Sequence, residues 1–109
     1  MNLSDLAIQS TEIIPVVHPD HGETELKVEI HHPLSRGYNA ALARMIADGL
    51  DKELPLAVLV AEAAFVQFHG EDSGAGVEIL RDDRFFWLAV SVYNHVNKKK
   101  VTSAQPSNS

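Results

Sequence analysis

The chain has 109 residues, enough for one domain and too few for two of ordinary size. It contains no cysteine, which excludes disulfides, a catalytic thiolate and a cysteine-ligated zinc. Its 15 acidic and 9 basic residues give a net charge of −6, so we expect none of the basic surface that nucleic-acid binding usually requires.

The first elements predicted along the chain are an N-terminal arm and a β-hairpin. We expect residues 1–11 to form the arm and residues 12–17, which are largely β-branched, to form a strand. Pro15 cannot donate a hydrogen bond to a neighbouring strand, which favours a position at the edge of a sheet. A turn rich in Pro, Asp and Gly follows, and residues 24–31 then alternate strictly between apolar and polar side chains. Residues 12–31 therefore predict a β-hairpin.

The middle of the chain predicts two helices and a short extended piece. Apolar residues from Tyr38 to Leu50 follow helical spacing, and Ser35 is a suitable N-cap for that helix. Pro55 suits the first turn of a second helix. Residues 65–68 alternate and are also compatible with an extended conformation, and residues 69–76 form a polar, glycine-rich loop. We expect residues 77–80 to be extended, with Asp82 or Asp83 capping a final helix.

The final helix, expected at about residues 83–98, has an unusually wide apolar surface. One stripe along it is formed by Phe85, Leu88, Ala89, Val92 and Val96. A second stripe is formed by Phe86, Val90 and Tyr93, so that the apolar arc covers about 200° and exceeds what one packing face needs. Trp87 projects to the polar side, where it is either exposed or covered by another segment such as the N-terminal arm. Exposed aromatic residues are enriched at binding hot spots. The candidate partner-binding residues are therefore Phe86, Trp87, Val90 and Tyr93.

These elements predict an α+β fold, with an N-terminal β-hairpin followed by three to four α-helices in one small domain. The domain is expected to span residues 12–98, and residues 99–109 are expected to be a disordered polar tail. We expect no signal peptide, because the first 20 residues lack its basic and apolar segments. We also expect no membrane span, since the longest apolar run, around residues 54–66, is too short and is interrupted by Pro55 and Glu62.

The polar residues offer weaker alternatives that involve a metal ion or catalysis. His18 and His21 are three apart, and a hairpin could bring them near His31 or His32, but the HExxH frame of a zinc enzyme is absent. The loop also holds His69 and the pair 72–73, which are the residue types of a hydrolytic triad, although a triad is defined by geometry. Polar turn residues explain these patterns better. We therefore expect no enzyme activity, no catalytic or metal-binding residue and no cofactor.

The order of these features resembles the small tail assembly chaperones of long-tailed bacteriophages and prophages. The resemblance covers about residues 12–98. It rests on the segments Val17-His18-Pro19-Asp20-His21-Gly22-Glu23, Leu26 to Ile30, Ser35-Arg36-Gly37-Tyr38, Phe68, Glu71-Asp72-Ser73-Gly74, Val77 to Leu80 and the helix from Asp83. Two positions depart from the family pattern: Phe68 stands where Trp is frequent, and Gly37 is unusual within a first helical turn.

The resemblance implies a non-catalytic protein that coats the tape-measure protein while the tail tube assembles around it. The implied partners are the tape-measure protein, the tail tube protein and further copies of the chain, in the cytoplasm of the bacterial host. The alternative is a small phage or bacterial adaptor, either a virion component or an inhibitor of a host protein. Family members are often also made in a longer form by a −1 ribosomal frameshift, and the codons of Lys98, Lys99 and Lys100 are the candidate slippery site. The alternative reading of these lysines is a basic helix end.

Overall fold

The structure is a computed structural model that describes residues 2–70 and 74–104. A three-stranded antiparallel sheet with the order β1-β2-β3 forms one of its layers. Side chains within these ranges are described up to Lys99. The strands are β1 (Thr11–His18), β2 (Gly22–His31) and β3 (Phe65–His69). The α-helices are α1 (Arg36–Ala47), α2 (Leu56–Ala64) and α3 (Phe86–Ala104). The short 3₁₀ helices are η1 (Leu3–Leu6), η2 (Leu50–Lys52), η3 (Val77–Arg81) and η4 (Asp83–Phe85).

The predicted α+β fold and its opening hairpin are confirmed. In β2, Val28 and Ile30 are buried whereas Glu25 and Lys27 are exposed, as the alternating sequence predicts. β1 lies at an edge of the sheet, and the strand register shifts just after Pro15. The missing N–H of Pro15 is thus accommodated where no further strand needs it.

The third strand extends the hairpin into a sheet, which the predicted fold of a hairpin and helices did not include. Residues 65–68 take the extended conformation that their alternation allows, and Phe68 pairs with Val28 across the β2–β3 ladder. Phe68 is buried, while Gln67 beside it is exposed. β3 therefore adds a large aromatic side chain to the inner face of the sheet.

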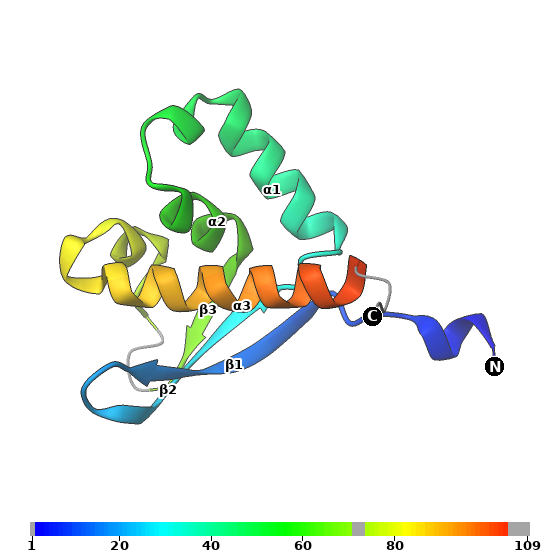
Figure 1. Ribbon diagram of the computed structural model, residues 1–109, viewed down its shortest axis with the longest axis horizontal. Coiled ribbons are helices and arrows are strands. Elements are labelled where there is room, and N and C mark those ends of the chain that lie inside the picture. Colours follow the sequence, from blue (N-terminus) through cyan, green and yellow to red (C-terminus); the bar gives the residue numbers. More distant parts are fainter. Residues whose placement is uncertain (1, 71–73, 105–109) are drawn as a thin grey trace.

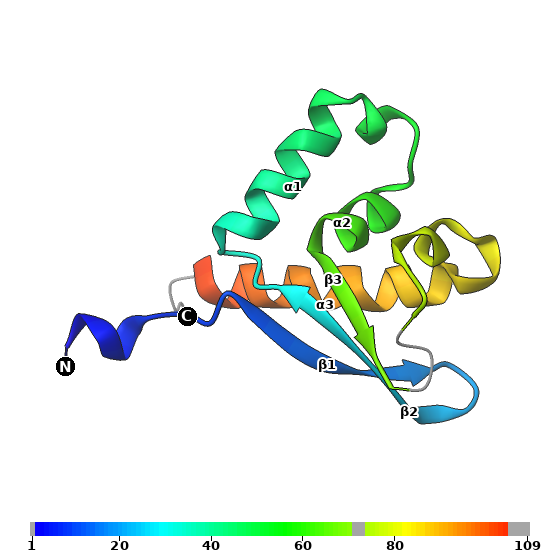
Figure 2. The same cartoon turned by 180° about the vertical axis from the view of Figure 1, so that it is seen from behind.

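Helix α3 lies across one face of the sheet and provides most of the second layer (Figure 1). Its predicted packing stripe is confirmed, because Leu88, Ala89, Val92 and Val96 are all buried. Helix α2 packs beside α3, and α1 leans outward from α2 (Figure 1). The view from behind shows the opposite face of the sheet without a helix across it in the described part of the chain (Figure 2).

The start of α1 explains the presence of glycine at position 37. Ser35 caps the helix as predicted, since its hydroxyl oxygen accepts a hydrogen bond from the Tyr38 N–H at 3.3 Å. A Cβ atom at Gly37 would lie 2.6 Å from Nδ1 of His31, which is closer than such atoms approach. A larger residue at position 37 would force the His31 ring to shift, which explains why glycine stands here despite its low helix propensity.

The expectation of an extended segment at residues 77–80 was wrong, because Val77–Arg81 forms the 3₁₀ helix η3. Leu80 is buried and its neighbour Ile79 also packs against the core. In a strand, adjacent side chains point to opposite faces, so an extended chain could not bury both from one side. The tight turn brings both apolar side chains to the same core.

The bounds of the last helix also differ from the prediction. Asp82 is a cap, as expected, but it first caps η4, and α3 begins at Phe86. The helix continues past residue 98 to Ala104, so residues 99–104 are helical where a disordered tail was expected. Residues 105–109 of that tail lie outside the described residues. So do residues 71–73 of the predicted loop, which include two of the three triad candidates.

The segment predicted as an N-terminal arm projects from the body of the molecule beside the C-terminal end of α3 (Figure 1). It contains η1, and Leu3, Leu6 and Ile8 along it are exposed. Thr11, the last residue assigned to the arm, belongs to β1. Within the described ranges, the structure contains no helix that combines the length and apolar character needed to cross a membrane.

Candidate functional site

The four residues predicted to bind a partner do not share one surface. Phe86 is 43% exposed on the outside of α3, and Val90, one turn further along, is half-buried. Tyr93 packs against the hydrophobic core. Trp87 follows Phe86 directly and therefore projects about 100° away from it around the helix. Phe86 and Val90 remain on the outer helix surface, whereas Trp87 and Tyr93 pack inward.

Trp87 is covered by the hairpin turn and not by the N-terminal arm. The rings of Trp87 and His18 meet edge to face with their centroids 4.8 Å apart. Phe85 lies on another side of the indole, with a centroid distance of 6.4 Å. Trp87 is partly buried as a result. The helical projection placed Trp87 on the polar side of its helix and gave no information about a turn that is distant in sequence.

The position of His18 is fixed by the turn that carries it. Its Nδ1 atom accepts hydrogen bonds from the backbone N–H groups of Asp20 at 3.0 Å and His21 at 3.2 Å. An imidazole that accepts at Nδ1 carries its proton at Nε2 when it is neutral. The His21 ring lies against His18, with a centroid distance of 4.5 Å. The local sequence of the turn thus orients the ring that contacts Trp87.

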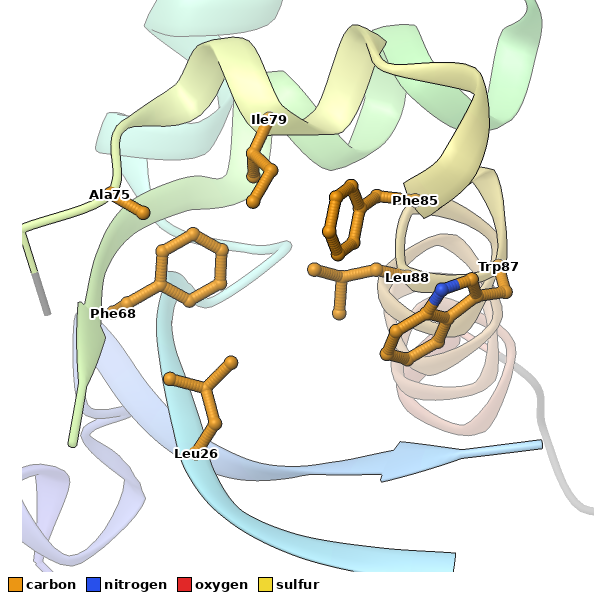
Figure 3. A pocket seen from close by; sticks show the side chains of 7 residues that line it. All are labelled: Leu26, Phe68, Ala75, Ile79, Phe85, Trp87 and Leu88. Carbon is orange, nitrogen blue, oxygen red and sulfur yellow. The ribbon is translucent and has the colours of Figure 1, made fainter. Parts of the chain in front are cut away.

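An apolar pocket opens beside Trp87 at the start of α3 (Figure 3). Its cavity has a volume of about 280 Å³. Five segments contribute to it: β2, β3, the turn before η3, η3 itself and the junction of η4 with α3. The lining residues are Leu26, Phe68, Ala75, Ile79, Phe85, Trp87 and Leu88. Figure 3 shows these side chains arranged around a common space. Every lining side chain is apolar or aromatic, so the pocket favours an apolar occupant.

Charged side chains near this pocket form two ion pairs. Arg81 donates hydrogen bonds from Nε and Nη2 to the two carboxylate oxygens of Glu62, and Arg84 Nη2 lies 2.7 Å from Asp82 Oδ2. Hydrogen bonds from the Arg84 side chain, and then from its backbone N–H, lower the pKa of Asp82 to about 2. Both basic residues of η3 and η4 are thus matched by a carboxylate. Glu78 and Asp83 on the same segment are exposed, so the surplus charge beside the pocket is negative.

The far half of α3 meets β1 through polar contacts. His95 Nε2 lies 2.7 Å from Glu12 Oε2, and Lys99 Nζ lies 3.7 Å from the other Glu12 oxygen. The two side chains of the closer pair are each about a quarter exposed. A more polar groove of about 340 Å³ lies here, lined by Ile8, Gln9, Thr11, Glu12, His32 and Lys99.

The open face of the sheet carries a further polar cluster. Glu29 accepts a hydrogen bond from Gln67 Nε2 at 3.0 Å, and its Oε1 lies 2.8 Å from His69 Nε2. These hydrogen bonds, with that from Gln67 the strongest, lower the pKa of Glu29 to about 2. The cluster ties β2 to β3 on the side away from α3.

Two of the histidines considered as metal ligands accept backbone hydrogen bonds within turns. Besides His18, His32 Nδ1 accepts from the Leu34 N–H at 3.1 Å, and His31 lies against Gly37. Throughout residues 2–70 and 74–99, no group of three or more histidine, aspartate or glutamate side chains is arranged to hold a metal ion. The three lysines at the candidate frameshift codons lie within α3, with Lys98 exposed and Lys99 near Glu12.

Comparison with protein-family models, with curated proteins and with solved structures finds no match to this chain. The function must therefore be inferred from the site. Of the pocket residues, the sequence singled out Trp87 alone as a binding residue. Leu26, Phe68 and Phe85 were recognised only as apolar residues of their own elements, and no local pattern indicates that they converge.

Proposed function

We propose that this protein is a non-catalytic binding protein that acts as a tail assembly chaperone of a long-tailed bacteriophage or prophage. In this proposal it works in the cytoplasm of the bacterial host, where it binds the tape-measure protein and assists assembly of the tail tube. The observation that carries the proposal is the open apolar pocket at the start of α3, close to the exposed Phe86. Such surfaces commonly mark sites where another molecule binds.

The chemistry of the pocket supports binding over catalysis. A hydrolytic or proton-transfer site needs an acid, a base or a nucleophile aimed at the reacting atoms. The lining of this pocket consists of apolar and aromatic side chains. Burial of apolar area from a partner contributes about 25 cal/mol per Å² before the cost of ordering the interface. A chaperone that shields apolar helices from aggregation uses this contribution.

Co-expression with the tape-measure protein of the same gene cluster tests the proposal. We expect a tape-measure fragment that is insoluble alone to become soluble and to co-purify with this chain. Phe86→Ser should reduce the yield of the complex, because it removes an exposed aromatic ring from the proposed contact surface. Asn94→Ser, at an exposed polar position of the same helix, is the matched control. A fragment that stays equally insoluble and does not co-purify with the wild type would contradict the proposal.

The gene offers an independent test through the predicted frameshift. We expect the codons of Lys98, Lys99 and Lys100 to contain an A-rich slippery heptamer followed by an overlapping reading frame. Because α3 continues through these lysines to Ala104, a shift there would replace the last turn of the helix with the start of the added segment. Lysine codons interrupted by G, with no overlapping frame, would remove this support.

A further inference from the structure

The geometry points to the occupant of the apolar pocket: we propose that it receives one phenylalanine or leucine side chain carried by a lysine- or arginine-rich segment of the partner. This inference rests on the proposed function, because it assumes that the protein binds another polypeptide. It goes further by naming the residues that receive the partner and the chemistry of the partner segment.

The size and lining of the pocket determine the apolar part of the occupant. An apolar cavity of roughly 150 Å³ already accommodates benzene. The cavity of about 280 Å³ therefore has room for a phenyl or leucyl group together with the first atoms of its backbone. Figure 3 shows Phe68, Phe85 and Trp87 turned toward the cavity, so an entering ring can meet aromatic faces and edges.

The charge around the pocket determines the rest of the partner segment. Arg81 and Arg84 are both engaged with carboxylates, whereas Glu78 and Asp83 on the same segment are exposed. The whole chain carries a net charge of −6. An acidic segment would be repelled on approach, while a basic one would be attracted and held in register beside the cavity. Charge complementarity therefore selects a basic partner.

The N-terminal arm of this chain does not match the proposed occupant. Leu3, Leu6 and Ile8 of the N-terminal arm are exposed, but the arm lies at the opposite end of α3 from the pocket (Figure 1). The sequence of the arm through residue 10 contains Asp5 and no lysine or arginine. It therefore lacks the basic character that Glu78 and Asp83 favour.

The proposal can be tested with a lysine-rich peptide that carries a single phenylalanine and no tryptophan. Trp87 is the only tryptophan of the chain, so its emission reports on the wall of the pocket. We expect the peptide to shift this emission to shorter wavelength in a saturable manner. A matched peptide with alanine in place of phenylalanine should bind at least tenfold more weakly, because the apolar contact is lost. Equal binding of the two peptides would overturn the proposal.

Filling the cavity from the protein side provides the second arm of the experiment. Ala75→Phe places a ring in the pocket without changing charge and should weaken peptide binding at least tenfold. Ala43→Phe, at an exposed position of α1, adds the same side chain elsewhere and is the control. Circular dichroism verifies that each variant is folded. If Ala75→Phe does not fold, Ala75→Leu replaces it as the filled variant. Unchanged binding by the folded, filled variant would overturn the proposal.

The charge and the alternative occupant are tested separately. Glu78→Gln combined with Asp83→Asn should weaken binding about threefold and reduce its dependence on salt, since both carboxylates are exposed. An unchanged salt dependence would contradict the proposal that the partner segment is basic.

The alternative occupant is a second copy of this chain. In that case Trp87 emission would change with protein concentration in the absence of peptide, and the double substitution Leu3→Ser with Leu6→Ser would abolish the change. This result would overturn the proposal.

The tape-measure experiment separates this inference from the proposed function. If Ala75→Phe solubilises the tape-measure fragment as well as the wild type does, the pocket assignment fails and the chaperone proposal stands. If the wild type leaves that fragment insoluble but binds the phenylalanine peptide in the pocket, the chaperone proposal fails and the pocket assignment stands. Loss of solubilisation in Ala75→Phe alone supports both.

Discussion

The two ends of helix α3 meet the sheet in different ways. Near Trp87 the contact is apolar and incomplete, and it leaves a cavity of about 280 Å³ between the helix and the inner face of the sheet. Near His95 the contact with β1 is a hydrogen bond between His95 and Glu12, and Lys99 lies beside it. One helix therefore combines a polar attachment with an apolar opening.

The largest change in the free energy of unfolding is expected at the pocket end of α3, where two Phe→Ala substitutions can be compared. Phe68 is only 2% exposed, and its ring both fills the core and lines the pocket. Phe68→Ala should lower the free energy of unfolding by about 3–5 kcal/mol. Phe86→Ala, which removes the same ring from the outside of α3, should cost less than about 1 kcal/mol. Urea denaturation measures both values, and similar losses would show that the Phe86 ring is not on the outside of α3.

The polar end can be weakened without touching the pocket. Glu12→Ala removes the acceptor of His95 and the neighbour of Lys99, and should lower the free energy of unfolding by about 1 kcal/mol. Glu23→Ala, at an exposed position of the same hairpin, should change it by no more than about 0.5 kcal/mol. Trp87 emission should stay at its wild-type wavelength in both variants. A shifted emission in Glu12→Ala would show that the two ends are coupled.

The elements that could be predicted from sequence are those determined by local patterns. Alternation of apolar and polar residues around Val28 and Ile30 indicates a strand with one solvent-exposed face. Ser35 indicates the start of a helix, because its side chain accepts a hydrogen bond from a backbone N–H of the first turn. The buried stripe of α3 follows from helical spacing alone. Residues 77–81 were mispredicted because their conformation depends on a core that Ile79 and Leu80 must reach together. Local propensity does not contain that requirement.

The site was less predictable because its geometry comes from contacts between distant segments. Trp87 was recognised as a candidate binding residue, but its cover comes from His18, in a turn near the other end of the chain. The pocket requires Leu26, Phe68 and Phe85 to meet, and each residue has an ordinary core role in its own element. Only the tertiary arrangement shows that these side chains leave a space between them.

His18 allows a finer test of how the pocket wall is held. Its Nδ1 accepts two backbone hydrogen bonds, which orient the ring that contacts Trp87. His18→Leu keeps most of the packing but cannot accept a hydrogen bond. It should lower the free energy of unfolding by about 1 kcal/mol or less, and the loosened turn should shift Trp87 emission to longer wavelength. An unchanged emission in His18→Leu would show that these hydrogen bonds do not hold the pocket wall.

The smallest effect concerns the charge that caps the entry to α3. The Arg84 side chain and backbone N–H lower the pKa of Asp82 from 3.8 to about 2, so folding favours the ionised form. The stability that this provides is fully present well above pH 3.8 and is lost as the pH falls through 3.8 toward 2. Asp82→Asn keeps a good capping side chain but removes the charge. Its free energy of unfolding should therefore fall less steeply between pH 5 and pH 2 than that of the wild type.

The Glu29 carboxylate, whose pKa is lowered from 4.5 to about 2, contributes separately to the pH dependence of the free energy of unfolding. Glu29→Gln should remove this contribution independently of Asp82. Because Asp82 borders the pocket end and Glu29 lies on the open sheet face, protonation of Asp82 in the wild type is expected to shift Trp87 emission at low pH, and only Asp82→Asn should reduce that shift. An equal reduction in Glu29→Gln would show that acid destabilisation does not distinguish the two faces of the sheet.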